Sequence, residues 1–129
     1  MLRFIDRVIN AGDYSVLDEL VHPDYVYRAP GQELQGVGAI RSLFEAYRSA
    51  FPDLHIDVDD LVAAGDRVAI AFTLTGTHAG ALMGIEATGQ RVSVDGTLFS
   101  RFEDGRIVEE WEVIDQFSLF SQLGVVAAA

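Results

Sequence analysis

The second half of the chain changes from helical to alternating spacing, and this change constrains the fold most. Apolar residues recur at every second position in Leu54–Val58 and again in Val68–Leu74. The pattern continues through Arg91–Phe102 and, after the turn signal Asp104-Gly105, as far as Asp115. Glycine supplies the positive φ that a tight hairpin turn requires. A period of two is typical of strands, so this half predicts a run of antiparallel strands.

The first half shows helical spacing instead. Apolar residues three or four apart predict a helix over residues 2–9, a short helix over residues 16–21 and a longer helix before Pro52. One face of the longest helix carries Ile40, Leu43, Phe44, Tyr47 and Phe51. Helices followed by strands predict an α+β fold, in which a curved, mainly antiparallel sheet wraps around the N-terminal helices. At 129 residues, we expect a single domain over residues 1–129.

The composition excludes several classes of partner. The formal net charge is −11 with nine basic residues, whereas nucleic acids and anionic membranes bind clustered Lys and Arg. Without cysteine the chain can form no disulfide and has no thiolate nucleophile. It has no apolar run of transmembrane length and no signal-peptide pattern. We therefore expect a cytoplasmic protein that binds neither nucleic acid nor membrane.

The last strand presents two different faces. One set of alternating residues is Ile107, Glu109, Trp111, Val113 and Asp115, and the other is Val108, Glu110, Glu112 and Ile114. We assign the set with the chain's one tryptophan to the protein interior and the set with two glutamates to the wetter face. A carboxyl on an apolar face is costly unless it is paired or protonated. Asp115 is therefore either a structural partner, such as a cap of the terminal helix through Ser118, or a working acid or base.

The register of the hairpin decides where Arg101 points. With a two-residue Asp104-Gly105 loop, Ser100 lies opposite Glu109 and Arg101 points away from the Asp115 face. With a three-residue loop and a bulge, Arg101 joins that face. Arginine keeps its charge, so it could hold an anionic oxygen or pair with a carboxylate but could not act as a neutral acid.

The histidines do not suggest a metal site. His22 and His55 have no partner at metal-ligand spacing, so we expect no zinc site, and we expect no other metal. His78 continues the apolar phase of Val68–Leu74, and a lone histidine in such a position is more often a hydrogen-bonded structural residue than a catalyst. We retain His78 as a candidate catalytic residue beside Asp115.

Short motifs along nearly the whole chain resemble the polyketide-cyclase-like (SnoaL-like) branch of the nuclear-transport-factor-2-like superfamily. They are Asn10-Ala-Gly-Asp13, Gly38-Ala-Ile-Arg41, Ala50-Phe-Pro-Asp-Leu54, Gly65-Asp-Arg-Val68, Gly76-Thr-His78, Thr88-Gly89, Asp104-Gly-Arg-Ile107, Trp111 with Asp115, and Gln122-Leu-Gly124. The resemblance implies a cone-shaped fold with a deep apolar pocket. It also implies that Asp115 is the general acid/base of an intramolecular aldol ring closure. Arg101 stands where known cyclases often carry a histidine.

The resemblance and the residues together predict a cofactor-free enzyme that acts on a small hydrophobic carbonyl compound. The candidate catalytic residues are Asp115, Arg101 and His78, and the candidate pocket residues are Trp111, Val113, Glu109, Tyr27 and Phe99. Ketosteroid-isomerase chemistry is not expected, because its base and its tyrosine align with Ala29 and Phe4. The alternative is a non-catalytic domain of the same fold that binds a small ligand or dimerises.

One strand predicts how the protein associates. Its alternate positions Ala69, Ala71, Thr73, Thr75 and Thr77 are small and uncharged in a strongly acidic chain. A solvated sheet face would normally carry charges, so we expect this outer face to form a homodimer. The resemblance also implies a dimer formed through the outer face of the sheet.

Overall fold

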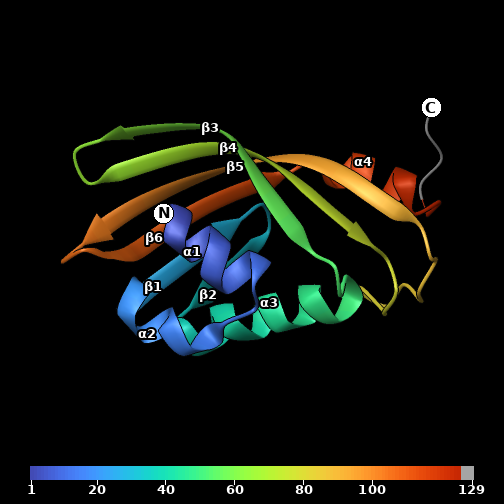
Figure 1. The fold of residues 1–129 in the computed structure, drawn as a ribbon, viewed down its shortest axis with the longest axis horizontal. Helices are drawn as coiled ribbons and strands as arrows, with labels where there is room; N and C mark the ends of the chain where they lie inside the picture. The colour runs from blue at the N-terminus through green and yellow to red at the C-terminus, as the bar shows by residue number, and fades with distance from the viewer. Residues whose placement is uncertain (126–129) are drawn as a thin grey trace.

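The protein is one curved sheet with the N-terminal helices packed against its concave side, while the C-terminal helix lies beside β5 (Figure 1). A computed structural model describes residues 1–125 of the chain. The six strands lie in the order β2-β1-β6-β5-β4-β3, and the sheet does not close on itself. This architecture confirms the predicted α+β fold. Within residues 1–125, no helix is long and apolar enough to cross a membrane.

The helical elements are short except for one. Their bounds are α1 Leu2–Phe4, α2 Leu17–Leu20, α3 Val37–Ala50 and α4 Gln116–Gln122, with a π-helical turn Ile5–Asn10 after α1 and a 3₁₀ turn Tyr14–Val16 before α2. Helix α3 ends where predicted, because proline disfavours the helical conformation at the residue before it and Phe51 is already extended, with φ of −126°.

The strands of the second half are longer than the spacing predicted, except the last, which ends at Ile114 rather than Asp115. Their bounds are β1 Val21–Ala29, β2 Gln32–Gln35, β3 His55–Ala64, β4 Arg67–Thr77, β5 Arg91–Glu103 and β6 Arg106–Ile114. Neighbouring strands are antiparallel except β1 and β6, which run parallel. In this parallel register Tyr27 lies opposite Glu110, and Arg28 lies opposite Trp111. Successive residues of a strand face opposite sides of the sheet, so these two pairs lie on different faces.

The core fills the space between the concave face and α1 and α3. Ile40 is fully buried, and Phe4 meets Phe44 edge to face with ring centroids 5.8 Å apart. Leu43, Phe44 and Tyr47 remain partly exposed although they share the apolar face of α3. They are not fully covered because a cavity lies between this helix face and the sheet.

The hairpin between β5 and β6 combines features of the two predicted registers. Asp104 and Gly105 form a two-residue loop in which both have positive φ, 54° and 76°. A bulge between Arg101 and Phe102 then shifts the pairing, so that Arg101 lies opposite Glu109. The bulge adds one unpaired residue to β6 and reverses which side chains face the helices beyond it.

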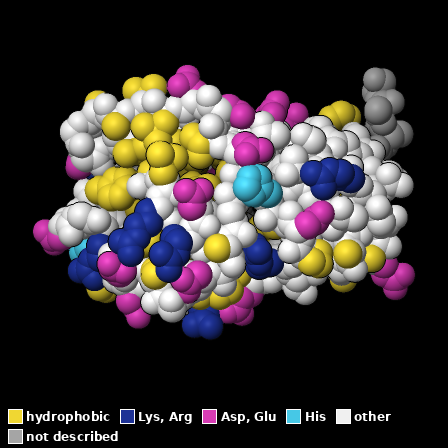
Figure 2. Space-filling view, in the orientation of Figure 1, with side chains coloured by type: hydrophobic (Ala, Val, Ile, Leu, Met, Phe, Trp, Pro, Cys, Tyr) yellow, Lys and Arg dark blue, Asp and Glu magenta, His cyan; other side chains and the backbone are white. Residues whose placement is uncertain are grey.

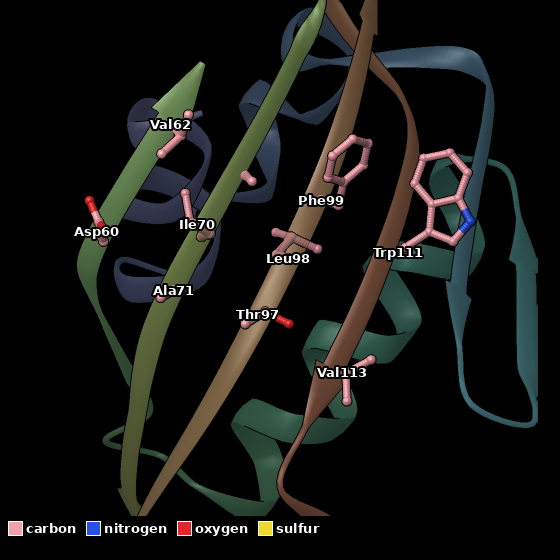
Figure 3. Close-up of a pocket in the computed structure, with 10 residues that line it drawn as sticks. Asp60, Val62, Ile70, Ala71, Thr97, Leu98, Phe99, Trp111 and Val113 are labelled. Carbon is pink, nitrogen blue, oxygen red and sulfur yellow. The ribbon is translucent and has the colours of Figure 1, made fainter. Parts of the chain in front are cut away.

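The predicted orientation of β6 is therefore wrong. Figure 3 shows the sheet with the helices behind it, and Trp111, Val113 and Phe99 lie on the near, convex side. Glu110 faces the interior instead and is fully buried. Trp111 is stable outside because it packs edge to face against Phe99 at 5.7 Å and under the guanidinium of Arg28 at 5.5 Å.

Candidate active site

Two glutamates of β6 point into the interior, and each is held by a tyrosine of the parallel strand β1. The hydroxyl of Tyr25 donates to Glu110 at 2.6 Å, and Ser100 donates to the other oxygen of the same carboxyl at 2.8 Å. The hydroxyl of Tyr27 donates to Glu112, also at 2.6 Å. Alternate residues of a strand share a face, so the pairs Tyr25–Glu110 and Tyr27–Glu112 form successive rungs of one ladder.

Burial changes the acidity of the whole ladder. Desolvation raises the pKa of Glu110 to about 7, against the opposing effect of the hydrogen bonds from Tyr25 and Ser100. Desolvation also raises the pKa of Glu112, opposed by the hydrogen bond from Tyr27. The pKa of both tyrosines rises as well, mainly through burial, so both hydroxyls stay protonated and remain donors.

Of the two glutamates, Glu112 is the one that borders the cavities beneath α3. Glu112 lines an inner cavity of about 30 Å³ under α3 and an adjoining vestibule of about 100 Å³ at the end of β1. The inner cavity is otherwise lined by Ile9, Leu43, Phe44, Tyr47, Leu54, Ile56, Leu74 and Ile114. The vestibule is lined by Tyr27, Ala29, Pro30, Gln32, Tyr47, Ile114 and Gln116. Among these lining residues of the described chain, Glu112 is the one acid, and its surroundings are mostly apolar.

Asp115 does not lie in this cavity. It is exposed and caps α4, where its Oδ1 accepts a hydrogen bond from the Ser118 amide at 3.0 Å. This is the structural alternative that the sequence left open. Trp111 and Val113 line a hollow on the convex face that does not include Asp115, so the predicted place of Asp115 in a cavity with them is wrong. Since β6 ends at Ile114, the alternation of the strand no longer determines where Asp115 points.

The cap makes a testable contribution to stability. Asp115→Ala should lower the free energy of unfolding by about 1 kcal/mol, because one amide of the first turn of α4 loses its acceptor. Asp115→Ser, which can still cap, should lose clearly less. Chemical denaturation of both variants measures the difference. Equal losses in the two variants would contradict a capping role.

Arg101 and Glu109 pair with each other on the convex face. Nε of Arg101 donates to Glu109 at 2.8 Å, and Arg28 donates to the other oxygen of the same carboxyl at 2.7 Å. The hydrogen bonds from Arg101 and then Arg28 hold the pKa of Glu109 below its usual value. Neither Arg101 nor Glu109 reaches the cavity, so their predicted place in the pocket is wrong. Of the predicted pocket residues, Tyr27 alone lines the vestibule.

His78 is fully buried beside the ring of Phe51, with ring centroids 5.5 Å apart. Its Nδ1 lies 3.0 Å from the hydroxyl of Thr88 and accepts a longer bond from the Thr88 amide. It lines neither the inner cavity nor the vestibule. Its contacts are those of a residue that fastens the loop between β4 and β5. Within residues 1–125, no three His, Asp or Glu side chains come together as a metal site would require.

Comparison with known proteins decides the family. A family model described as SnoaL-like polyketide cyclase matches residues 1–123, almost the whole chain. The chain belongs to the SnoaL-like polyketide cyclase family.

Three similar proteins match nearly the whole chain. Aklanonic acid methyl ester cyclase DnrD of Streptomyces peucetius is 28% identical over 130 residues, which cover 96% of this chain and 88% of DnrD. The crystal structure of AclR from Streptomyces galilaeus is 37% identical with a TM-score of 0.86, covering 97% of this chain and 92% of AclR. TsrD from Streptomyces laurentii is 32% identical with a TM-score of 0.88, covering 98% of this chain and 92% of TsrD.

Sequence analysis missed the two inner glutamates of this SnoaL-like chain. We took Glu110 and Glu112 as solvated because acidic residues are rarely buried without a partner. A signal was nevertheless present, since Tyr25 and Tyr27 share the same two-residue spacing in the segment that forms β1. Two hydroxyl donors and two carboxyl acceptors with equal spacing are what paired strands need in order to bury both acids.

Proposed function

We propose that this protein is a cofactor-free acid/base enzyme that acts on a small hydrophobic carbonyl compound, with Glu112 as the acid/base. The observation that carries this proposal is the position of Glu112, a carboxyl that meets an apolar cavity while Tyr27 fixes its orientation. Desolvation raises the pKa of the Glu112 carboxyl above its usual value, in the direction that suits proton transfer better than a solvated carboxyl would.

The proposed reaction is an intramolecular aldol ring closure. The Glu112 carboxylate takes a proton from the carbon next to one carbonyl, and the electrons of that C–H bond form an enolate. The enolate carbon then bonds to the carbon of a second carbonyl, whose oxygen becomes an alkoxide and takes the proton back from Glu112. The hydroxyl of Tyr47, which lines both the inner cavity and the vestibule, is suited to donate to the enolate oxygen.

Membership in a polyketide cyclase family supports a ring closure as the reaction. The acid/base that we propose, Glu112, differs from Asp115, which the resemblance implied. DnrD is named as a cyclase of a methyl ester, and an ester is a carbonyl compound, as the proposed class requires. We assign the proton transfer to Glu112 rather than Asp115 because the oxygen of Asp115 is engaged by α4. The alternative is a non-catalytic domain that holds a small apolar ligand in the same cavity.

Aklanonic acid methyl ester in D₂O separates these two functions. An enzyme of the proposed kind should introduce deuterium next to a carbonyl, or form a ring-closed isomer, faster than buffer alone. Mass spectrometry detects the deuterium, and chromatography detects the isomer. Saturable binding of the ester with neither exchange nor closure would favour the binding domain and contradict the proposed enzyme.

We also propose that the convex face pairs with the same face of a second copy. This face carries a largely apolar hollow of about 430 Å³. The residues that line it are drawn in Figure 3. Its lining includes Ala69, Ala71, Phe99, Trp111 and Val113, and three of these residues are large apolar side chains on an acidic protein. In the orientation of Figure 1, Figure 2 shows hydrophobic side chains gathered over the end of the sheet where β3 turns into β4. A contiguous apolar surface of this kind usually marks an interface.

The dimer prediction has a direct test. Trp111→Glu places a charge in the hollow and should convert the dimer to monomer, raising the dissociation constant by roughly 100-fold or more. Sedimentation velocity at micromolar concentration measures the change. Leu2→Glu is the matched control, because Leu2 is also exposed but lies on α1, on the other side of the sheet. A monomeric parent protein, or a Trp111→Glu variant that remains dimeric, would contradict the proposed interface.

A further inference from the structure

The inner cavity beside Glu112 is small and almost entirely apolar. It holds about 30 Å³. A site needs ~10–15 Å³ of volume of this kind to hold one water-sized group, so about two carbon atoms with their hydrogens fit. Apart from the carboxyl of Glu112 and the phenol of Tyr47, the lining consists of aliphatic and phenyl side chains. The cavity therefore suits a methyl or an ethyl group, and its other walls offer no partner to a charged one.

One end of this cavity is buried in the protein core. Ile9 and Ile56, which line it there, leave only 5% and 6% of their surface exposed, and Leu74 of the lining is buried as well. On the other side, Tyr47 and Ile114 are only partly buried. A ligand group therefore enters from the side of Tyr47 and Ile114 and stops at Ile9 and Ile56.

Hydrogen bonds fix the buried end. The side chain of Asn10 accepts from the Ile56 amide at 2.7 Å and donates to the Ile56 carbonyl at 3.0 Å, as a neighbouring strand would. The guanidinium of Arg48 donates to the carbonyl of Ile9 at 2.7 Å and to that of Asn10 at 3.0 Å. These four bonds give the first residue of the motif Asn10-Ala-Gly-Asp13 a role beside the candidate site. Walls that are packed and bonded in this way recede for a longer group only at a cost in free energy.

We propose that the inner cavity binds a short alkyl end of the substrate, a methyl or an ethyl group, beside the carboxyl of Glu112. The inference rests on the proposed function, because it identifies one end of the ligand of the same site. Up to the size limit, each buried CH₂ group should strengthen binding roughly fourfold. One methylene too many should weaken binding by roughly tenfold or more, because it has to displace side chains of the core.

A series of ketones tests this limit. Each carries a tert-butyl group on one side of the carbonyl and a methyl, ethyl, propyl or butyl group on the other. The tert-butyl group is too bulky for the cavity, so only the linear arm can enter. Titrations are followed by NMR of isoleucine and leucine methyl groups, with Ile56 and Leu74 reporting the cavity and Ile107, which is buried elsewhere, as reference. The ethyl ketone should bind most tightly, and the propyl and butyl ketones should bind roughly tenfold more weakly or worse.

Enlarging the cavity should move the optimum. Leu74→Ala removes three carbon atoms from the wall, so the propyl or the butyl ketone should become the tightest ligand. Leu17→Ala is the matched control, because Leu17 is also buried but lies on α2 and does not line the cavity. It should keep the order of the parent protein. If Leu74→Ala does not fold, Leu74→Val, which removes one carbon atom, should still reduce the loss of affinity from the ethyl to the propyl ketone.

Three results would overturn this alkyl site. They are an affinity that rises steadily from the methyl to the butyl ketone, an order that the Leu74 variants leave unchanged, and no saturable shift of the cavity methyls with any ketone. The titrations record binding alone, so they separate the alkyl site from the proposed function. The predicted order without deuterium exchange of the ester would support the site and contradict the enzyme. Exchange of the ester together with a steady rise in ketone affinity would support the enzyme and contradict the site.

Discussion

Replacing Glu112 by glutamine is expected to lower turnover of the ester by about 100- to 10,000-fold, the usual contribution of a positioned acid or base. Glutamine has the same shape and can still accept the hydrogen bond from Tyr27, but it cannot exchange a proton at neutral pH. The ester should therefore bind with nearly unchanged affinity. Steady-state rates and a separate binding titration measure the two effects. A variant with wild-type rates would remove Glu112 from the chemistry.

Glu110→Gln is expected to change the free energy of unfolding rather than turnover. The change should grow as the pH rises from about 4.5 to about 7. The folded-state pKa of Glu110 is about 7, above the ordinary value of 4.5. Below about pH 4.5 this carboxyl is protonated in both states. As the pH rises from there to about 7 the unfolded chain releases its proton first, so the folded protein loses stability. The full difference corresponds to about 3 kcal/mol above pH 7.

The glutamine variant should escape this loss. Its amide can accept from Tyr25 and donate to Ser100, so both contacts of the buried group are kept. Urea unfolding at pH 4 and pH 8 should give similar stability for both proteins at the lower pH, and a variant more stable by about 3 kcal/mol at the higher pH. Glu86→Gln removes the same charge from an exposed site and serves as control. A parallel pH dependence in parent and Glu110→Gln would show that Glu110 is not the titrating group.

Two other charges act on Glu110 and bear on this result. The neighbouring Glu112 raises the pKa of Glu110, while the Met1 amine lowers it. The double variant Glu110→Gln, Glu112→Gln should therefore gain less stability than the sum of the gains of the two single variants. Each single replacement already relieves the repulsion between the two glutamates, and the double variant can relieve it only once.

The sequence was sufficient for the fold and for much of its detail. Spacing predicted α3 and its end before Pro52, and alternation predicted the strands on both sides of Asp104-Gly105. These features depend on local conformational preferences, which a single sequence displays directly. The parallel pairing of β1 with β6 joins segments some 85 positions apart, as in the Tyr25–Glu110 contact, and no local signal reveals such a pairing.

The orientation of the last strand could not be read from periodicity alone. Alternation separates two faces but does not say which is inside, and we chose the face with Trp111. The choice failed because this protein keeps an apolar surface outside and two hydrogen-bonded acids inside, the reverse of the usual distribution. The bulge between Arg101 and Phe102 also gave the hairpin a register that differs from both of the predicted ones. The candidate site moved with it, from Asp115 to Glu112.

The most direct test compares Glu112→Gln with Asp115→Asn in one experiment, the incorporation of deuterium from D₂O into aklanonic acid methyl ester at neutral pH. The two variants make the same chemical change, from carboxyl to amide, three residues apart. We expect Glu112→Gln to reduce the enzyme-dependent exchange rate by at least about 100-fold, whereas Asp115→Asn, which can still cap α4, should stay within about threefold of the parent. The opposite order, with exchange lost in Asp115→Asn and kept in Glu112→Gln, would contradict the assignment of the acid/base to Glu112.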